Sequence, residues 1–362
     1  MSQLHVLLKH GHTVEAIQKL KHEFENEHGV EVLCEVVGED EAYHRLISAV
    51  DLPDVCTVPY WYLPELVEAS VLEPMSMEDL ETTHHPIANE ALSISGQQFA
   101  VPHTLVGSAF FYRKDRLGTI SQQTLGSLDL LLNYLEEIVV SGESFGLRTS
   151  QHFSTAETYR GLAFPEGTDL FRDLMADRTG WLSPAGNRFV ELLEKQRVDV
   201  SNCGYAEVGE LFMSGRLSLM FDTSAWSTIF SKNPEFFELV EVAQIGLQPK
   251  AQFFYAEGLG IVSGSSNRGL AKEFVMWRQS ERIVSYEISE LNRLDFPRSD
   301  LNRFESFAIA TSTNAGARVR DEIEKSWESI ESSYPVQTAG YVPWATNFST
   351  ALSKRLIENR AG

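Results

Sequence analysis

The fold class is decided by the stretch Leu52–Val55 (LPDV), Tyr60–Tyr62 (YWY) and Glu65–Pro74 (ELVEASVLEP). Its residue types predict a short buried strand, a loop that carries three aromatic side chains, and an amphipathic helix that ends before a second loop. In an α/β lobe, the loop after such a strand lies at the edge of the sheet where ligands bind. The stretch therefore predicts one binding edge of an α/β protein.

The residues before this stretch predict a β–α–β unit. An apolar run at Leu4–Leu8 and a β-rich run at Val30–Leu33 flank a segment whose apolar residues recur at helical spacing. The residues at this spacing are Val14, Ile17, Leu20 and Phe24. Gly29 is expected to end the helix. Parallel strands joined by helices place their ligand crevice at the carboxyl ends of the strands.

Later segments follow in the order of a known family. They are Gly96–Pro102 (GQQFAVP), Ser108–Leu117 (SAFFYRKDRL), Gly215–Trp226 (GRLSLMFDTSAW), Phe253–Ser263 (FFYAEGLGIVS) and Ala339–Trp344 (AGYVPW). With the stretch at 52–74, they resemble bacterial extracellular solute-binding proteins of the sugar-binding, maltose-binding-protein-like class. The resemblance extends over nearly the whole chain.

This resemblance implies an α/β protein with the two-lobed periplasmic-binding-protein-like fold. Each lobe would be a mostly parallel sheet flanked by helices, with the ligand in the cleft. The order of the segments places residues 1–104 and 255–303 in lobe one, and residues 105–254 and 304–362 in lobe two. The implied protein is a monomeric receptor that captures a small ligand, a carbohydrate, between two closing lobes and delivers it to an ABC transporter membrane permease. It would need no cofactor and would not be an enzyme.

Composition agrees with a two-lobed globular protein. At 362 residues, of which 43% are hydrophobic and 10% aromatic, the chain can fill two cores. The 30 basic residues against 51 acidic ones give a formal net charge of −21. Such a charge disfavours binding to nucleic acid or to an anionic membrane, because phosphate surfaces require a basic patch.

The N-terminal residues and the cysteines bear on the compartment. No run of 18 or more apolar residues occurs, and Met1–Leu8 has no basic region of a signal peptide. We expect a periplasmic or membrane-anchored extracellular protein whose signal segment is absent from this sequence; the alternative is a cytoplasmic ligand-sensing module of a regulator. Three cysteines without CxxC spacing are expected to be buried free thiols: Cys34, Cys56 and Cys203.

A sugar site needs flat aromatic rings against the C–H faces and polar groups for the hydroxyls. The sequence offers both types of side chain after expected strands and near the C-terminal segment. The candidate ligand-binding residues are Tyr60, Trp61, Tyr62, Asp222, Trp226, Tyr341 and Trp344. Trp277 and Trp327 lie at helical spacing and are expected in the core.

His10 and His12 are further candidates, because they lie in the loop between the first strand and the first helix. Backbone amides at a helix start can bind an oxygen or an anion. The alternative is a plain capping loop with Thr13 as the N-cap. After the AVP run, His103–Val106 lacks the acid or Asn that many relatives have there, which leaves the ligand's identity open. No histidine shows the HExxH spacing of a metal site, so no metal is predicted.

A serine hydrolase is the competing catalytic interpretation. Gly142–Gly146 fits the G-x-S-x-G pattern around Ser144, and Ile138–Val140 could be the strand before it. The residues that follow lack the periodic apolar helix of a nucleophile elbow, and His152 is the only histidine downstream. The receptor interpretation is therefore favoured.

Overall fold

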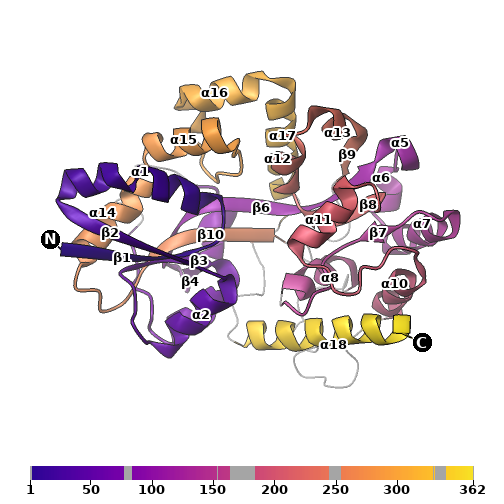
Figure 1. Cartoon of the computed structure of the whole chain (residues 1–362), viewed down its shortest axis with the longest axis horizontal. Coiled ribbons are helices and arrows are strands. Elements are labelled where there is room, and N and C mark those ends of the chain that lie inside the picture. The colour runs from indigo at the N-terminus through magenta and orange to yellow at the C-terminus, as the bar shows by residue number, and fades with distance from the viewer. Residues whose placement is uncertain are drawn as a thin grey trace. The chain divides into compact units, whose positions relative to one another are not determined.

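A computed structural model describes residues 2–76, 84–152, 154–163, 184–243, 254–328, 330 and 340–361. The chain divides into two compact units. Unit 1 comprises Met1–Leu105, Tyr255–Arg320 and Val336–Ala339, and unit 2 comprises Val106–Phe254, Asp321–Pro335 and Gly340–Gly362. The colours of Figure 1 follow the chain through both units.

Unit 1 contains parallel and antiparallel strands together with flanking helices. Its strands are β1 (Ser2–Lys9), β2 (Val30–Val37), β3 (Val55–Pro59), β4 (Ser93–Ile94), β5 (Gln97–Gln98) and β10 (Phe254–Ile261). Its helices are α1 (His12–His28), α2 (Glu39–Ser48), η1 (Tyr60–Tyr62), α3 (Leu63–Glu68), α4 (Pro86–Ala91), α14 (Arg268–Arg278), α15 (Glu281–Leu291), η4 (Leu301–Arg303) and α16 (Glu305–Ser312). Two elements begin in unit 1 and end in unit 2: β6 (Ala100–Arg113) and α17 (Asn314–Glu328).

Unit 2 has its own helices and strands. Its strands are β7 (Phe145–Gly146), β8 (Leu219–Thr223) and β9 (Val240–Ala243). Its helices are α5 (Lys114–Leu117), α6 (Gln122–Leu125), α7 (Leu128–Ser141), α8 (Ser154–Ala163), α10 (Pro184–Lys195), α11 (Tyr205–Met213), α12 (Trp226–Phe230), α13 (Pro234–Leu239) and α18 (Tyr341–Ala361). None of the helices in the described ranges is both long enough and apolar enough to cross a membrane.

In the unit 1 sheet, β1 lies between β2 and β3, and both pairs are parallel. Val6 is opposite Cys34 of β2 and Val55 of β3. β10 runs antiparallel to β3, with Leu259 opposite Thr57, and the start of β6 follows β10 in the strand order. The α/β class predicted from the sequence is confirmed.

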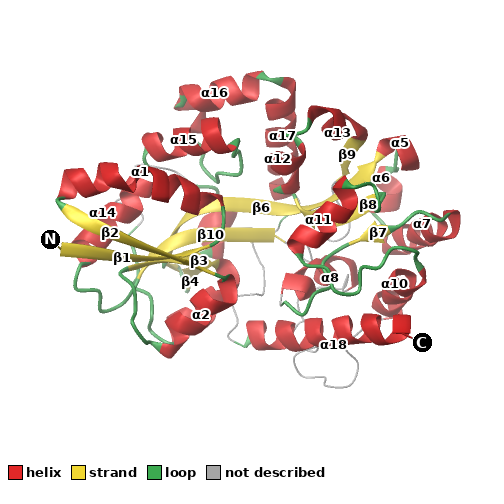
Figure 2. Cartoon of the chain, in the orientation of Figure 1, coloured by secondary structure: helices red, strands yellow, loops and turns green. Residues whose placement is uncertain are grey.

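The core of unit 1 lies between this sheet and α1 and α14. Leu4, Val6 and Leu8 share one face of β1, because alternate residues of a strand point the same way. They pack with Phe24 of α1 and Phe274 of α14, and all five side chains are fully buried. Figure 2 shows α1 and α14 on one side of the strands and α2 on the other.

The ends of α1 show one correct and one wrong expectation. Gly29 ends the helix as predicted: it adopts a left-handed conformation with φ 65°, and its N–H donates to the Glu25 carbonyl at 2.9 Å. Thr13 is not the N-cap, because α1 begins at His12 and Gly11 takes the cap position. The Thr13 hydroxyl instead accepts a hydrogen bond from Arg293 at 3.2 Å.

The aromatic stretch forms a short helix rather than a loop. Tyr60–Tyr62 are η1, which follows β3 directly and leads into α3. The predicted amphipathic helix is α3, which ends at Glu68, and Ser70 just beyond it adopts a left-handed conformation with φ 56°.

Residues 304–320 fall in unit 1, whereas the sequence-based division placed them in lobe two. α16 packs against α15 and η4 of unit 1. The Arg320 guanidinium donates to the carbonyls of Leu294 and Phe296, at 2.8 and 3.2 Å. The packing of α16 and the hydrogen bonds of Arg320 join segments within unit 1. No local sequence pattern indicates such contacts, so the sequence-based boundary missed them.

In unit 2, β8 pairs antiparallel with β6 and parallel with β7. Asp222 of β8 is opposite Ala109 of β6, and Leu219 is opposite Phe145 of β7. β9 pairs antiparallel with β6.

The local structure around Ser144 does not fit the hydrolase interpretation. Ile138–Val140, proposed as the strand before the nucleophile, lies inside the helix α7. Ser144 is buried, and its carbonyl accepts hydrogen bonds from the backbone and the hydroxyl of Ser218. His152 contacts the Ser154 hydroxyl at 2.7 Å. Short apolar runs do not distinguish helix from strand, which explains the wrong expectation.

Candidate functional site

The strand ends of unit 1 bring several polar and aromatic side chains to one edge. β1 ends at Lys9 and the parallel β3 ends at Pro59, directly before η1. β10 runs the other way, so its first residues lie at the same edge, with Glu257 opposite Pro59. This is the edge at which α/β proteins bind ligands.

Lys9 is the centre of a polar cluster at this edge. Its ammonium group lies 2.8 Å from a carboxylate oxygen of Glu257 and 3.3 Å from one of Glu39. It also donates to the Tyr255 hydroxyl and lies 4.5 Å from the centre of that ring. We call Lys9, Glu39, Trp61, His103, Tyr255 and Glu257 the Lys9 cluster.

Glu257 connects Lys9 to a buried histidine. The other carboxylate oxygen of Glu257 is 3.0 Å from Nε2 of His103, whose side chain has no exposed surface. Because an ionised carboxylate can only accept, Nε2 carries the proton. The Tyr255 hydroxyl also donates to Glu257.

The surroundings keep Lys9 and Glu257 charged and His103 neutral. Burial would lower the pKa of Lys9, but the charges of Glu257 and Glu39 outweigh burial and raise that pKa above its usual value. Burial would raise the pKa of Glu257, but Lys9 and the hydrogen bond from His103 hold it well below its usual range. Burial lowers the pKa of His103, although Glu257 opposes this shift.

Trp61 belongs to the Lys9 cluster. Its indole N–H donates to Glu39 at 2.7 Å, and its ring centre is 4.8 Å from that of Tyr255. Tyr60 is buried beside it, with 5.1 Å between the ring centres. Tyr62 packs on α2 instead, where it stacks on Tyr43 at 4.2 Å and donates to Asp40 at 3.0 Å.

The two predicted histidines lie near the same edge. His10 follows β1, is exposed, and donates its backbone N–H to the Val37 carbonyl at 3.1 Å. His12 is the first residue of α1, and its side chain lies outside the described part of the structure.

In unit 2, Asp222 forms an ion pair with Arg148. Nε and Nη2 of Arg148 donate to the two carboxylate oxygens at 2.8 and 2.6 Å, and the Asp222 side chain is fully buried. Arg148 lies over the ring of Tyr205 at 4.9 Å, and Tyr205 stacks on Trp226 at 4.6 Å. The sequence thus predicted Asp222 and Trp226 but missed Arg148 and Tyr205, which connect them.

Trp226 is buried to the same degree as Trp61, with 3% and 2% of the two residues exposed. A β-carbon on Gly209 of α11 would lie 1.8 Å from the Trp226 ring. Its indole N–H is buried and has no acceptor among the described residues. Buried Trp N–H groups usually have a partner, so this donor is available to a water molecule or a ligand oxygen.

Tyr341 and Trp344 lie in the first turns of α18. Tyr341 is buried and Trp344 is half-buried, with 5.9 Å between their ring centres. Trp344 stacks on Phe348 at 5.6 Å, and Phe348 meets Tyr159 of α8. Both predicted residues thus contribute to the packing of α18.

Lys9, Glu39, Tyr255 and Glu257 are residues that the sequence analysis missed. A charged residue in an apolar strand, such as Glu257 in the run from Phe254 to Ile261, is a signal that could have identified Glu257 but not its partners.

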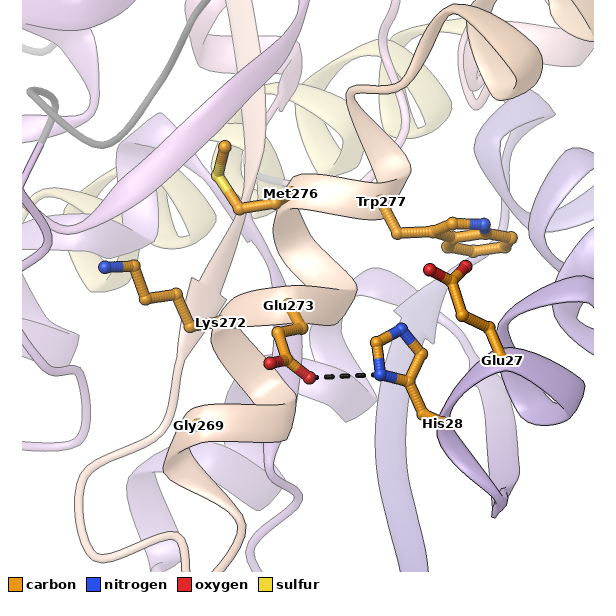
Figure 3. Close-up of a pocket in the computed structure, with 7 residues that line it drawn as sticks. All are labelled: Glu27, His28, Gly269, Lys272, Glu273, Met276 and Trp277. Carbon is orange, nitrogen blue, oxygen red and sulfur yellow. Dashed lines mark ion pairs between the residues drawn. The ribbon is translucent and has the colours of Figure 1, made fainter.

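A cavity of about 580 Å³ lies elsewhere in unit 1, between the end of α1 and α14. In Figure 3, Glu27, His28 and Glu273 converge beside Trp277, with His28 paired to Glu273 at 3.1 Å. None of the predicted site residues lines this cavity. It adjoins the last turn of α1, whereas the Lys9 cluster adjoins its first turn, about 25 Å away along a helix of 17 residues.

The described residues include no group of three or more His, Cys, Asp or Glu side chains that could hold a metal ion. All three cysteines are free; Cys56 and Cys203 are buried as expected, and Cys34 is half-buried. Burial raises the pKa of Cys56 to about 12 and that of Cys34 and Cys203 to about 11, which keeps the thiols protonated.

Residues 19–282 match the family model of the bacterial extracellular solute-binding protein. The chain belongs to this family. It is therefore a solute-binding receptor, and the resemblance inferred from its motifs is confirmed. No curated protein matches the sequence.

Solved structures of solute-binding proteins share the fold of this family member. The protein of Agrobacterium vitis S4 with bound D-mannitol is 16% identical, with a TM-score of 0.73 over 99% of this chain and 94% of that one. The protein of Thermotoga lettingae with α-D-tagatose is 16% identical, with a TM-score of 0.76 over 99% and 95%. The Listeria monocytogenes protein with cycloalternan is 17% identical, with a TM-score of 0.71 over 99% and 97%.

Proposed function

We propose that this receptor binds a carbohydrate or polyol and delivers it to the membrane permease of an ABC transporter. The observation that carries the proposal is the pairing of Trp61 and Tyr255 beside the charged groups of the Lys9 cluster. Aromatic rings suit the C–H faces of a sugar, and carboxylates suit its hydroxyls. The sugar and polyol ligands of the similar solved structures support the same class.

We take the two units as the two lobes and propose one binding edge on each. On unit 1, Trp61, Tyr255 and Glu39 would contact the ligand, and Lys9 would hold Glu39 and Tyr255 in place. Tyr60 and Tyr62 would lie behind them. On unit 2, Tyr205, Arg148 and the indole N–H of Trp226 would do so, and Asp222 would hold Arg148 in place. His10, His12, Tyr341 and Trp344 stay candidates.

No chemical step is needed for this function. A ligand that contacts both units stabilises the closed arrangement by its differential affinity, and the permease would recognise that closed form. The family's description as extracellular supports a periplasmic or membrane-anchored location. We propose that the receptor acts as a monomer.

A thermal-shift screen of neutral sugars, polyols, amino acids and peptides tests the ligand class, since a ligand that binds only the folded state raises the melting temperature. We expect sugars or polyols to be the hits. Amino acids or peptides as the only hits would overturn the proposed class.

A matched pair of variants tests the site by calorimetric titration with the best hit. Trp61→Phe removes the indole N–H bonded to Glu39 and should weaken binding roughly 5- to 50-fold. Trp277→Phe makes the same replacement at the distant cavity and should leave the affinity within about twofold. Equal effects of the two replacements would show that the Lys9 cluster is not the site.

A further inference from the structure

We propose that Glu257 is the positioning residue of the unit 1 edge: it holds Lys9 in place and gives the edge a net negative charge that rejects acidic sugars. The inference rests on the proposed function and specifies its ligand as an uncharged or cationic sugar or polyol.

The hydrogen bonds of Lys9 leave no donor for an anionic ligand. An ammonium group has three N–H donors. Three acceptors within the Lys9 cluster match them: Glu39, Glu257 and the Tyr255 hydroxyl. A ligand carboxylate could gain Lys9 only by displacing one of these partners, with two carboxylates already beside it.

The charges of the cluster sum to a negative value. Lys9 contributes one positive charge, Glu39 and Glu257 contribute one negative charge each, and burial keeps His103 neutral by lowering its pKa. Asp40, bonded to Tyr62 nearby, is a further acid. The Lys9 and Glu39 side chains keep 16% and 17% of their surface exposed, so this charge is within reach of a ligand.

Glu257 is the residue on which this arrangement depends. Its two oxygens hold three partners, namely Lys9, Tyr255 and His103. Without its carboxylate, Lys9 would keep Glu39 as its charged partner, and the charges of the Lys9 cluster would sum to zero.

The first test needs no ligand. Lysine acetylation by an N-hydroxysuccinimide ester is followed by mass spectrometry, with exposed Lys19 as the internal reference in each protein. Glu257→Gln should raise the labelling rate of Lys9 relative to Lys19 by about tenfold or more, because the neutral amine becomes more populated and less shielded. The matched control Glu35→Gln removes a carboxylate paired with Arg45 and should leave the ratio unchanged. An unchanged Lys9 ratio in folded Glu257→Gln, or the same rise in both variants, would overturn the positioning role.

The second test measures charge selectivity by titration with three probes of one carbon skeleton: D-glucitol, D-gluconate and D-glucamine. We expect the wild type to bind gluconate at least about tenfold more weakly than the other two. Glu257→Gln should reduce that ratio toward one, whereas a purely structural defect would weaken all three equally. Glu257→Asp keeps the charge on a shorter side chain, so it should weaken binding yet keep the ratio.

Gluconate as the best wild-type ligand, or an unchanged ratio in Glu257→Gln, would overturn the charge selection. If none of the three probes binds, the proposed polyol class fails for this skeleton, and the labelling result alone decides the role of Glu257.

Discussion

Arg148 donates to both carboxylate oxygens of Asp222, at 2.8 and 2.6 Å, although the two residues are far apart in the sequence. β7 and β8 are parallel, so the chain leaves both strands at the same edge, where Arg148 follows β7 and Asp222 is near the end of β8. The pair is therefore a product of the sheet topology, and it fixes the guanidinium over the Tyr205 ring.

Breaking this pair should destabilise unit 2 strongly. Asp222→Ala leaves a buried guanidinium without its counter-charge and should lower the free energy of unfolding by about 3–5 kcal/mol. Asp115→Ala removes an acid paired with Arg113 at the surface and should cost less than ~1 kcal/mol. Urea unfolding of the two variants checks the contrast, and similar losses would contradict it.

Gly209→Ala should be destabilising although alanine favours helices. The new β-carbon would lie 1.8 Å from the Trp226 ring, which must shift at a cost of about 1–3 kcal/mol. Gly269→Ala is the matched control in α14, since no atom lies within 4 Å of the new carbon. That change should be neutral or stabilising by up to ~1 kcal/mol. Denaturant midpoints compare the two, and a stable Gly209→Ala would show that Trp226 is loosely held.

Acid should destabilise the protein through His84. Burial lowers its pKa from the usual value of 6.5 to about 4, so the unfolded chain takes up a proton that the folded one does not. The stability from His84 is present above pH ~6.5 and is lost as the pH falls toward ~4, at up to about 1.4 kcal/mol per pH unit.

Urea unfolding at several pH values checks this dependence. The slope of the unfolding free energy against pH reports the protons taken up on unfolding. His84→Gln should lower that uptake by about one proton, while His22→Gln, at an exposed position of α1, should leave the slope unchanged. A slope that survives in His84→Gln would mean that another group titrates.

The thiols should be unreactive in the folded protein. Ellman's reagent should react slowly at pH 8 with Cys56 and Cys203, because burial both blocks access and raises the pKa of each thiol. All three cysteines should react rapidly in urea. Rapid reaction of two or more thiols without denaturant would contradict the structure.

Local patterns predicted the local features correctly. The apolar spacing of α1, its end at Gly29 and the strand before Tyr60 follow from residues close together in the sequence. The Lys9 cluster could not be predicted in this way, because Glu257 and Tyr255 meet Lys9 only through the pairing of β10 with β3. The packing of Trp226, a predicted site residue, depends on the missing side chain of Gly209, a neighbour that no spacing rule identifies.

The sheet of unit 1 also constrains how the chain can fold during synthesis. β3 ends at Pro59, but its antiparallel neighbour β10 begins at Phe254, roughly 200 residues later. At typical translation rates of about 5–20 residues per second, β3 waits on the order of 10–40 s for this partner. Such a pairing gives a high contact order and slow folding, so the sheet of unit 1 stays incomplete until β10, which ends at Ile261, has left the ribosome.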